Sequence, residues 1–421
     1  MLTKAPKGTR DILPGETAAW RKIEGVLHEL ATLYGYEEIR TPVFEHTELF
    51  QRSVGDTTDI VQKEMYTFPD KAGRSLTLRP EGTAGVVRSF IEQGMTSLAM
   101  PVRLYYLISA YRYENVQKGR YREFHQFGAE AFGAPGPDID AEVISLLWLL
   151  FERLGIKQVQ LNINSIGCPV CRRAYQERLK TFFVDSGKNL CQTCLGRLNR
   201  NPMRILDCKE AECRTASAHA PDLLDFVCGS CRDHFDGLQQ GLVRLQIPYQ
   251  IDKRIVRGLD YYTRTVFEFV SDSIGAQGTV CGGGRYDGLV EECGGARVPG
   301  IGFGLGLERL FLQMESEGVS LTDEEKPKVF LVAAEATAIP FIDGLAYALR
   351  RRGIRTDREL TGRSLKAQMK YAGKTGVRYV VVIGGDEIAS GSATLKDMDT
   401  GETVPVSLDP EALKNVIARE M

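Results

Sequence analysis

The hydrophobic pattern of residues 104–132 predicts a β-hairpin. Residues 104–115 are rich in aromatic and β-branched side chains, which suit a half-buried strand. Residues 115–120 are polar and contain Gly119, so they predict a turn. Residues 121–132 then predict the returning strand, which would pair with the first.

Polar side chains cluster on one predicted face of this hairpin. Because side chains alternate across a strand, residues of equal parity share a face. Arg112 and Glu114 would share a face of the outgoing strand, and the matching face of the returning strand would carry Phe124, Gln126, Gly128 and Glu130. We expect Gly128 to leave room there for a polar ligand. The alternative interpretation is a solvated sheet face crossed by ion pairs.

Apolar periodicity outside the hairpin predicts further helices and strands. Helical spacing marks residues 16–34 and the strongly apolar residues 139–154. Residues 37–44 predict a strand in which Pro42 favours an edge or an interface. Residues 168–247 differ, with cysteine pairs and short helical patterns, and predict an inserted, mainly helical domain. The remaining strands are predicted at 159–163, 248–252, 260–270, 278–281 and 300–304.

The C-terminal part has its own pattern. Residues 315–328 are charged and contain a proline, which predicts a linker. Beyond the linker, strand and helix patterns alternate, which predicts a mostly parallel sheet with helices on its faces. The alternating segments are 329–334, 340–352, 354–356, 364–375 and 379–384. The expected domains are therefore 1–325, with the insertion at 168–247, and 328–421.

Size and charge limit the possible functions. A chain of 421 residues exceeds one ordinary core, which agrees with two or three domains. The formal net charge is −2, so a nucleic acid would have to bind to a local patch. Residues 350–378 offer such a patch, with ten basic and two acidic side chains, an excess of eight positive charges. This composition indicates a polyanionic partner.

The cysteines raise the question of a metal. The first residues lack an apolar signal region and the longest apolar run, 143–151, is too short to span a bilayer, so we expect a cytoplasmic protein with reduced cysteines. Repeated C-x-x-C spacing in such a protein indicates structural zinc, and buried reduced thiols are the alternative. The candidate ligands are Cys168, Cys171, Cys191, Cys194, Cys208, Cys213, Cys228 and Cys231.

Several motifs together identify a family resemblance. The hairpin, the stretch TLRPEGTAG (77–85) and the stretch GFGLGLERL (302–310) resemble motifs of class II aminoacyl-tRNA synthetases. KGTRDILP (7–14), RGLDYYTRTVFEF (257–269) and GGGRYDGL (282–289) resemble signature peptides of the histidyl-tRNA synthetases. The resemblance covers essentially the whole chain.

The resemblance implies a fold and an activity. The fold would be an α+β catalytic domain with a mixed, mostly antiparallel sheet, a mainly helical insertion and an α/β C-terminal anticodon-binding domain. The activity would be the ligation of L-histidine to histidine tRNA through a histidyl-adenylate, with ATP and Mg²⁺, in a homodimer whose interface includes residues 37–44.

The resemblance also assigns individual residues. Arg112 would hold the α-phosphate of ATP as a catalytic cation, Glu114 would lie near the adenine amino group, and Arg309 would stack on the adenine. Arg120 would reach the γ-phosphate or the tRNA acceptor end. The histidine site would contain Glu81, Gly82, Thr83, Gln126, Glu130, Tyr261, Tyr262 and Tyr286, although core packing is the simpler role for any one tyrosine.

Arg257 is the second catalytic residue that the resemblance implies. Its guanidinium would lie between the histidine carboxylate and the α-phosphate. A salt bridge to Asp260 that only steadies the strand is the alternative role.

One competing function is a regulatory subunit of ATP phosphoribosyltransferase, a synthetase-like protein that binds histidine-like ligands and charges no tRNA. Such proteins typically lack the C-terminal domain and an intact RGLDYY peptide. Both are present here, so we expect the ligase.

Overall fold

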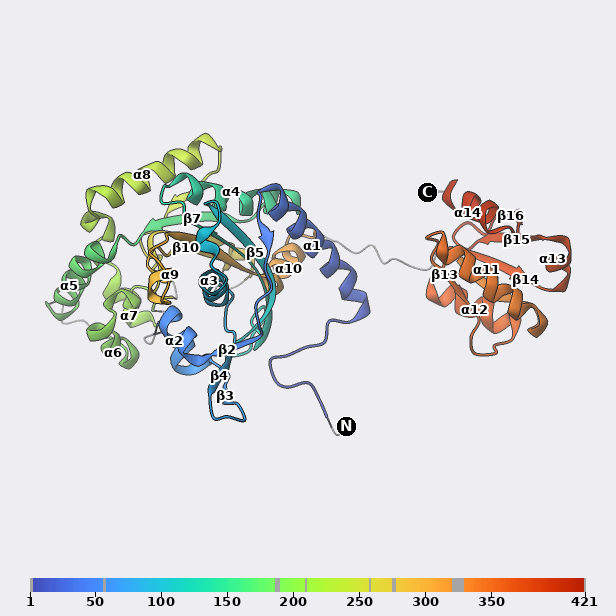
Figure 1. Cartoon of the computed structure of the whole chain (residues 1–421), viewed down its shortest axis with the longest axis horizontal. Helices are drawn as coiled ribbons and strands as arrows, with labels where there is room; N and C mark the ends of the chain where they lie inside the picture. Colours follow the sequence, from blue (N-terminus) through green and yellow to red (C-terminus); the bar gives the residue numbers. More distant parts are fainter. Residues whose placement is uncertain are drawn as a thin grey trace. The chain divides into compact units, whose positions relative to one another are not determined.

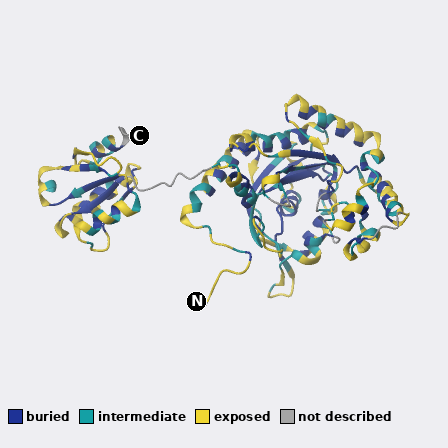
Figure 2. Ribbon diagram, turned by 180° about the vertical axis from the view of Figure 1, so that it is seen from behind, coloured by how far each residue is buried: buried dark blue, intermediate teal, exposed yellow. Residues whose placement is uncertain are grey.

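The computed structural model describes residues 3–419 except 56–57, 186–189, 209, 257–258, 275–277 and 320–328. The chain divides into two units, Met1–Leu321 and Thr322–Met421, which can be followed by colour in Figure 1. The strands of both units are largely buried, whereas the outward faces of the helices are exposed (Figure 2).

The first unit is built on an eight-stranded sheet in the order β1-β5-β6-β11-β10-β9-β7-β8. The pairs β1–β5 and β7–β8 are parallel, and every pair between them is antiparallel. This confirms the predicted mixed, mostly antiparallel sheet. The strands are Glu37–Glu38 (β1), Val102–Tyr111 (β5), Glu123–Phe132 (β6), Gln160–Ser165 (β7), Gln250–Ile251 (β8), Thr263–Val270 (β9), Thr279–Arg285 (β10) and Gly300–Gly306 (β11).

The predicted hairpin forms from β5 and β6. Their register runs from Val102 opposite Phe132 to Tyr111 opposite Glu123. The position expected for Arg112 and Glu114 is wrong, because β5 ends at Tyr111 and both residues lie beyond the strand. The ladder ends there because the backbone N–H of Tyr113 turns away from β6 and donates to the carbonyl of Glu64 at 2.7 Å.

Helices cover one face of this sheet and leave part of the other open. The covered face packs against α1 (Pro14–Leu33), α4 (Asp138–Arg153), α8 (Gly229–Arg244) and α10 (Leu307–Ser316) in one hydrophobic core. Alternation places Tyr105 of β5 in this core and Tyr106 on the opposite face. The opposite face packs against α3 (Thr83–Glu92) and α9 (Leu289–Glu292).

A small three-stranded sheet lies beside the hairpin, in the order β2-β4-β3. The strand predicted over 37–44 is wrong as a single element, because β1 ends at Glu38 and β2 begins only at Phe44. Pro42 lies in the break, where it has no N–H to donate to a ladder. The elements of this region are Phe44–His46 (β2), Thr47–Val54 (α2), the π-helical turn Ile60–Glu64, Thr67–Pro69 (β3) and Ser75–Leu78 (β4).

The chain between β7 and β8 is helical. It contains Pro169–Asp185 (α5), Gln192–Arg200 (α6), Ala211–Ser217 (α7) and α8, with short 3-10 helices at Pro202–Ile205 and Leu223–Phe226. Its apolar side chains, among them Tyr175, Leu179 and Ile205, continue the core on the open face of the main sheet. In Figure 1, α5, α6 and α7 lie together at one end of this unit.

The second unit is a five-stranded sheet in the order β13-β12-β14-β15-β16. The first three of these strands are parallel, as predicted, and β15 and β16 add an antiparallel edge that the prediction lacked. Its elements are Val329–Ala333 (β12), Ile339–Arg351 (α11), Thr356–Arg358 (β13), Leu365–Thr375 (α12), Tyr379–Ile383 (β14), Gly385–Ser390 (α13), Ser392–Asp397 (β15), Thr403–Ser407 (β16) and Pro410–Arg419 (α14).

Among the described residues, no helix is both long enough and apolar enough to cross a membrane.

Candidate active site

The open face of the main sheet has a floor of glycines. Gly302, Gly304 and Gly306 of β11 lie opposite Glu130, Gly128 and Gln126 of β6. A Cβ on Gly302 would collide with the Glu130 carboxylate, and one on Gly304 would collide with the Gln126 amide. Gly302 and Gly304 are therefore needed because polar side chains of β6 lie across the neighbouring strand.

Tyr106 fills the space above Gly128. The two residues face each other across β5 and β6, and a Cβ on either Gly82 or Gly128 would run into the tyrosine ring. The expectation that Gly128 leaves room for a polar ligand is therefore wrong, because its cross-strand neighbour supplies a large ring on the same face. Tyr106 was missed by sequence reasoning, although its parity in the strand marks this face.

Glu130 is completely buried and receives three hydroxyl hydrogen bonds. Thr83 Oγ1 donates to Oε1 at 2.7 Å, Tyr106 donates to Oε1 at 3.1 Å, and Tyr286 donates to Oε2 at 2.5 Å. Burial raises the pKa of the Glu130 carboxyl to about 8, although the three hydroxyls lower it. A carboxyl group in this environment can hold a proton near neutral pH and can therefore donate or accept.

Glu81 is a second buried carboxylate of this cluster. Its two oxygens accept the backbone N–H groups of Thr83 and Ala84, both at 2.8 Å, at the start of α3. Burial raises the pKa of Glu81, and these backbone donors lower it in part. The start of α3 thus fixes Thr83, whose hydroxyl in turn reaches Glu130.

Three predicted tyrosines pack together beside these carboxylates. The rings of Tyr261 and Tyr262 have centroids 4.7 Å apart, and those of Tyr261 and Tyr286 are 5.7 Å apart. All three are buried. The structure therefore brings the predicted histidine contacts from 81–83, 261–262 and 286 together with Glu130 of β6 in one cluster.

The arginine and glutamate residues after β5 form a charged group. Arg112 Nε donates to the carbonyl of Pro80 at 2.8 Å, which fixes the guanidinium at the end of the hairpin. Glu114 lies between two cations, 3.7 Å from Arg112 Nη1 and 3.2 Å from Arg120 Nη1. These three side chains were predicted to act together, and the structure places them together.

Arg309 enters the same region from the first turn of α10. Burial, and behind it the charge of Arg120, lower the pKa of Arg309 to about 10. Two cations held near each other favour an anion between or beside them. The preceding residue, Glu308, joins α10 to β6 by accepting the backbone N–H of His125 at 3.0 Å and contacting its ring Nδ1 at 2.8 Å.

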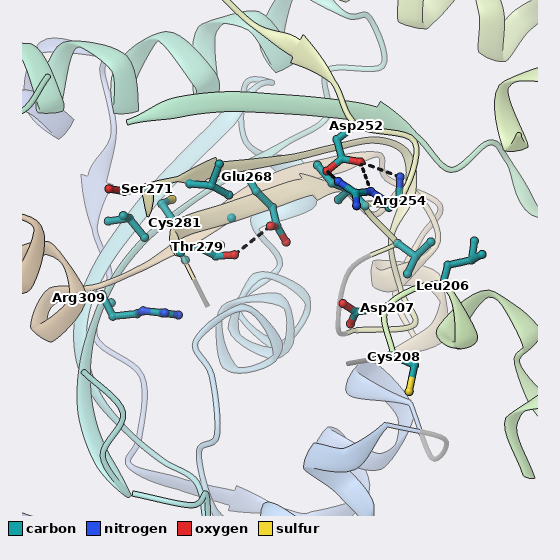
Figure 3. A pocket seen from close by; sticks show the side chains of 18 of the residues that line it. Leu206, Asp207, Cys208, Asp252, Arg254, Glu268, Ser271, Thr279, Cys281 and Arg309 are labelled. Atoms are coloured by element: carbon teal, nitrogen blue, oxygen red, sulfur yellow. Dashed lines mark hydrogen bonds and ion pairs between the residues drawn. The ribbon is translucent and has the colours of Figure 1, made fainter. Parts of the chain in front are cut away.

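A cavity of about 1290 Å³ lies over this glycine floor. Arg309 lies at one side of the cavity in Figure 3, whereas Leu206, Asp207 and Cys208 lie at the other. Arg112, Glu114, Arg120 and Gln126 also line it. Gln126 Oε1 is buried and has no hydrogen-bond partner within the described chain, so a donor on a ligand could satisfy it.

The cavity and the buried cluster are neighbours but distinct. All predicted ATP contacts and Gln126 line the cavity, whereas Glu81, Gly82, Thr83, Glu130, Tyr261, Tyr262 and Tyr286 lie outside its lining. Gln126 and Glu130 share one face of β6 and connect the two regions. Arg257 lies outside the described residues. Asp260, its alternative partner, accepts a hydrogen bond from Asn201 Nδ2 at 3.1 Å.

A buried ion pair supports the strand end next to this cluster, and sequence reasoning missed it. Arg285 of β10 and Asp140 of α4 are both fully buried, with Nη2 and Oδ1 2.5 Å apart. His234 of α8 contacts the other oxygen of Asp140 at 2.8 Å. Burial raises the pKa of Asp140, but Arg285 and His234 outweigh it and lower the pKa below its usual value. Arg285 was visible in the GGGRYDGL peptide, but its partners come from distant helices.

The eight cysteines predicted as metal ligands gather into two groups of four. One group contains Cys168, Cys171, Cys228 and Cys231, and the other contains Cys191, Cys194, Cys208 and Cys213. All are free thiols in the structure.

The basic segment of the second unit is partly neutralised. Arg352, Arg358 and Arg378 form ion pairs with Glu411, Asp343 and Asp397, respectively. Lys366, Lys370 and Lys374 are exposed and spaced by four residues on α12, so they share one face of that helix.

Comparison with known proteins supplies the family. The family described as "Histidyl-tRNA synthetase" matches residues 8–173 and 210–310, and the family described as "Anticodon binding domain" matches 328–419. The unmatched stretch 174–209 contains Cys191, Cys194 and Cys208.

Sequence relatives and solved structures agree with this match. The histidine–tRNA ligase of Acetivibrio thermocellus is 62% identical over 409 residues, covering 97% of this chain and 98% of the relative. That of Caldanaerobacter subterraneus is 51% identical, covering 99% and 100%. The crystal structure of apo histidyl-tRNA synthetase from S. aureus has a TM-score of 0.84 at 40% identity and covers 98% of this chain and 99% of its own.

Proposed function

Because this chain belongs to the histidyl-tRNA synthetase family, we propose that its arginine-lined cavity and the buried Glu130 cluster form one active site for ATP and histidine. The chain is an ATP-dependent histidine–tRNA ligase of class II. The observation that carries the site assignment is the continuous face of β6. On it, Gln126 reaches the cavity and Glu130 reaches the buried cluster.

The first chemical step joins two anions. The histidine carboxylate attacks the α-phosphorus of ATP, a phosphorus–oxygen bond forms to give histidyl-adenylate, and pyrophosphate leaves. The protein must hold both anions in line and neutralise charge on the transferring group. We assign Arg112 to the α-phosphate, because its Nε bond to Pro80 fixes the guanidinium toward the cavity that it lines.

The adenosine and terminal phosphates are assigned to the other charged residues of the cavity. Arg309 would stack on the adenine, Glu114 would accept the adenine amino group, and Arg120 would reach the γ-phosphate or the tRNA acceptor end. Burial and then the charge of Arg120 lower the pKa of Arg309, so phosphate groups beside these two cations would be favourable. ATP enters as its Mg²⁺ complex, in which phosphate and water oxygens supply most of the metal ligands.

Histidine recognition is assigned to the buried cluster and Gln126. A site that pairs both imidazole nitrogens and the ammonium group leaves buried polar atoms unpaired when another amino acid enters, which gives strong discrimination. Gln126 Oε1 supplies an acceptor without a partner among the described residues. The Glu130 carboxyl supplies a donor or an acceptor according to its proton, and Tyr261, Tyr262 and Tyr286 would wall the ring.

Arg257 completes the proposed site. It belongs to the RGLDYY peptide, and the same peptide carries Tyr261 and Tyr262 into the buried cluster. We assign its cation to the space between the histidine carboxylate and the α-phosphate.

We also propose a homodimer. Large apolar side chains are exposed at the end of the broken strand and on the small sheet, namely Val43, Phe44 and Phe68, and the rings of the two phenylalanines pack edge to face. An apolar patch beside an exposed sheet edge is typical of a protein interface. Sedimentation equilibrium should give twice the chain mass of 46.8 kDa, and Phe44→Asp should shift the protein toward the monomer. A monomer at micromolar concentration would contradict the proposal.

Transfer of histidine to tRNA involves the second unit, which matches the anticodon-binding family. Because tRNA charging serves translation, we place the reaction in the cytoplasm. We propose that any resident zinc is structural and belongs to the insertion.

Histidine-dependent exchange of pyrophosphate into ATP tests this function. A ligase catalyses the exchange without tRNA, because adenylate formation is reversible. A regulatory subunit of ATP phosphoribosyltransferase would bind histidine without exchange. Exchange with histidine and none with the other amino acids is the expected result, and histidine binding without any exchange would overturn the proposal.

A further inference from the structure

Each four-cysteine group of the insertion has the geometry of a metal site. Within each group all sulfur atoms lie within 4.8 Å of one another. The Sγ atoms of Cys168 and Cys171 are 3.5 Å apart, and those of Cys191 and Cys208 are 3.9 Å apart. A zinc ion with four bonds of about 2.3 Å places its sulfur ligands about 3.8 Å apart, whereas a disulfide needs about 2.0 Å.

Backbone groups of each site already point at sulfur. The N–H of Cys228 donates to Cys171 Sγ at 3.1 Å, and the N–H of Cys191 donates to Cys213 Sγ at 3.3 Å. Amide donors of this kind stabilise metal-bound thiolates. The second cysteine of every pair is buried, whereas the first is partly or fully exposed. The two groups therefore have the same pattern of backbone donors and of buried and exposed sulfur atoms.

We infer that the insertion binds two zinc ions, one in each group, and that the ion bound by Cys191, Cys194, Cys208 and Cys213 holds one wall of the catalytic cavity in place. Four thiolates in a tetrahedral cluster favour zinc, which needs no redox partner. The outer site is defined as Cys168, Cys171, Cys228 and Cys231, and the inner site as Cys191, Cys194, Cys208 and Cys213.

The two sites are nested along the chain. Cys168 and Cys171 lie where the chain leaves β7 for α5, and Cys228 and Cys231 lie where it enters α8 to return to the sheet. The outer site thus closes the base of the insertion. The inner site closes a shorter loop inside it, around α6 and the 3-10 helix Pro202–Ile205. A metal that closes a loop of a small domain stabilises it by restricting the unfolded chain.

The inner site touches the cavity directly. Cys208 is one of its ligands and also lines the cavity together with Leu206 and Asp207, opposite Arg309 in Figure 3. Arg197 of α6 donates to Asp59 of the catalytic part at 3.0 Å, which connects the same segment to the sheet-bearing region. Loss of the inner ion should therefore loosen this wall and leave the glycine floor intact.

Metal analysis of four-serine variants tests both the presence and the pairing of the sites. Full-length protein purified without chelator should contain about two zinc per chain. Replacing all four outer cysteines by serine should leave about one zinc, and replacing all four inner cysteines should also leave about one. Replacing Cys168, Cys171, Cys191 and Cys194 should leave none, because each site loses half its ligands. If instead the first two cysteine pairs in the sequence shared one ion and the last two pairs shared the other, the first two variants would keep no zinc and the third would keep about one. Cys293→Ser, outside both groups, is the control and should keep both ions.

The wild-type protein provides a test that does not depend on variant folding. A mercurial reagent should release both zinc ions as eight of the ten thiols react. Less than about a tenth of an equivalent of metal, with those thiols reactive in the folded protein, would overturn the proposal, and so would iron in place of zinc.

Amide hydrogen exchange tests whether the inner site holds residues 202–208 of the cavity wall in place. In the inner-site variant, exchange over 202–208 should rise at least tenfold while β9, β10 and β11 keep their protection. In the outer-site variant, 202–208 should change less. Equal protection of 202–208 with and without the inner ion would overturn the role of this site in the cavity.

Discussion

The hydroxyl of Tyr286 donates to Oε2 of Glu130 at 2.5 Å, so the residue that follows β10 holds the buried carboxyl group of β6. Thr83 and Tyr106 occupy the other oxygen. Oε2 therefore keeps room for one further donor. If histidine binds here as proposed, its imidazole can pair with Oε2 while the three hydroxyls stay in place.

Removing the Glu130 carboxyl should weaken histidine binding. Glu130→Ala leaves three hydroxyls and a bound imidazole without their common partner, which should cost about 2–4 kcal/mol of histidine affinity. Binding of ATP should change little, because its predicted contacts line the cavity. Separate titrations with histidine and ATP measure both effects. Glu123→Ala, on the same strand but outside the cavity lining, is the control. A histidine affinity unchanged within twofold in Glu130→Ala would remove Glu130 from the site.

The raised pKa of Glu130 should appear in the pH dependence of stability. The folded pKa of about 8 lies above the usual value of 4.5. Below pH 4.5 both the folded and the unfolded chains carry the proton. As the pH rises toward 8 the unfolded chain releases it first, so stability should fall by at most about 1.4 kcal/mol per pH unit. Glu130→Gln should remove this contribution, and the difference between the two chains in urea unfolding isolates it from Glu81. If the free energies of unfolding of the unchanged chain and of Glu130→Gln ran parallel from pH 5 to 8, Glu130 would be ionised in the folded state.

Arg257 should affect rate more than stability. Arg257→Ala should lower the single-turnover rate of adenylate formation by about 10²–10³ and leave the binding of ATP and histidine nearly normal, because a cation serving developing charge acts in the transition state. Arg257→Lys should recover little, since an ammonium group cannot form the two-pronged contact of a guanidinium. A lower unfolding temperature, with more than about a third of the normal rate, would instead indicate the salt bridge with Asp260.

The Asp140–Arg285 pair should be a major contribution to stability. Asp140→Ala removes the fully buried carboxylate that Arg285 and His234 share and leaves Arg285 only the partly exposed Asp287, which should cost about 3–5 kcal/mol. Asp138→Ala on the same helix is the matched control, because its ion pair with Arg244 is largely exposed and should cost less than about 1 kcal/mol. Denaturant unfolding of both variants measures the difference. Equal effects would show that Asp287 and the carbonyls of Ala134 and Gly136 satisfy Arg285 without Asp140.

The lysine face of α12 should contribute to tRNA affinity through phosphate contacts. Reversing Lys366, Lys370 and Lys374 to glutamate should weaken tRNA binding and flatten its salt dependence, by about 0.7–0.9 in the logarithmic slope for each lost contact. Pyrophosphate exchange should stay normal. Among single reversals, Lys370→Glu should weaken binding, whereas Lys414→Glu on α14, where the lysine pairs with Glu411, should have little effect. Equal effects of the two single variants would contradict a specific role for α12.

The sequence predicted the class of fold and most elements of the first unit, because strand alternation and helical spacing are local signals. It failed where the outcome depends on distant partners. Pro42 signalled a weak strand, but the split into β1 and β2 follows from the separate pairing of Phe44 with Leu78. The antiparallel strands β15 and β16 of the second unit were missed, although Ala393 and Leu395 of β15 alternate with exposed side chains, because short runs of this kind also occur in loops.

The candidate site also has features that the sequence could predict and features that depend on distant partners. The family resemblance grouped Arg112, Glu114, Arg120 and Arg309, and all four line one cavity in the structure. The space above Gly128 could not be judged from β6 alone, because the ring that fills it belongs to β5. The grouping of the cysteines was also open, because the first and last pairs share one group while the two pairs between them share the other.

Tyr106 connects two glycines that lie far apart in the chain, since Gly82 and Gly128 both touch its ring. A mutational library that varied these three positions one at a time would find each of them intolerant. A larger residue at either glycine could be accommodated only if position 106 shrank in the same molecule, and a smaller residue at 106 alone would leave a void. The three positions therefore form one packing unit, and a larger side chain at either glycine requires a smaller one at position 106.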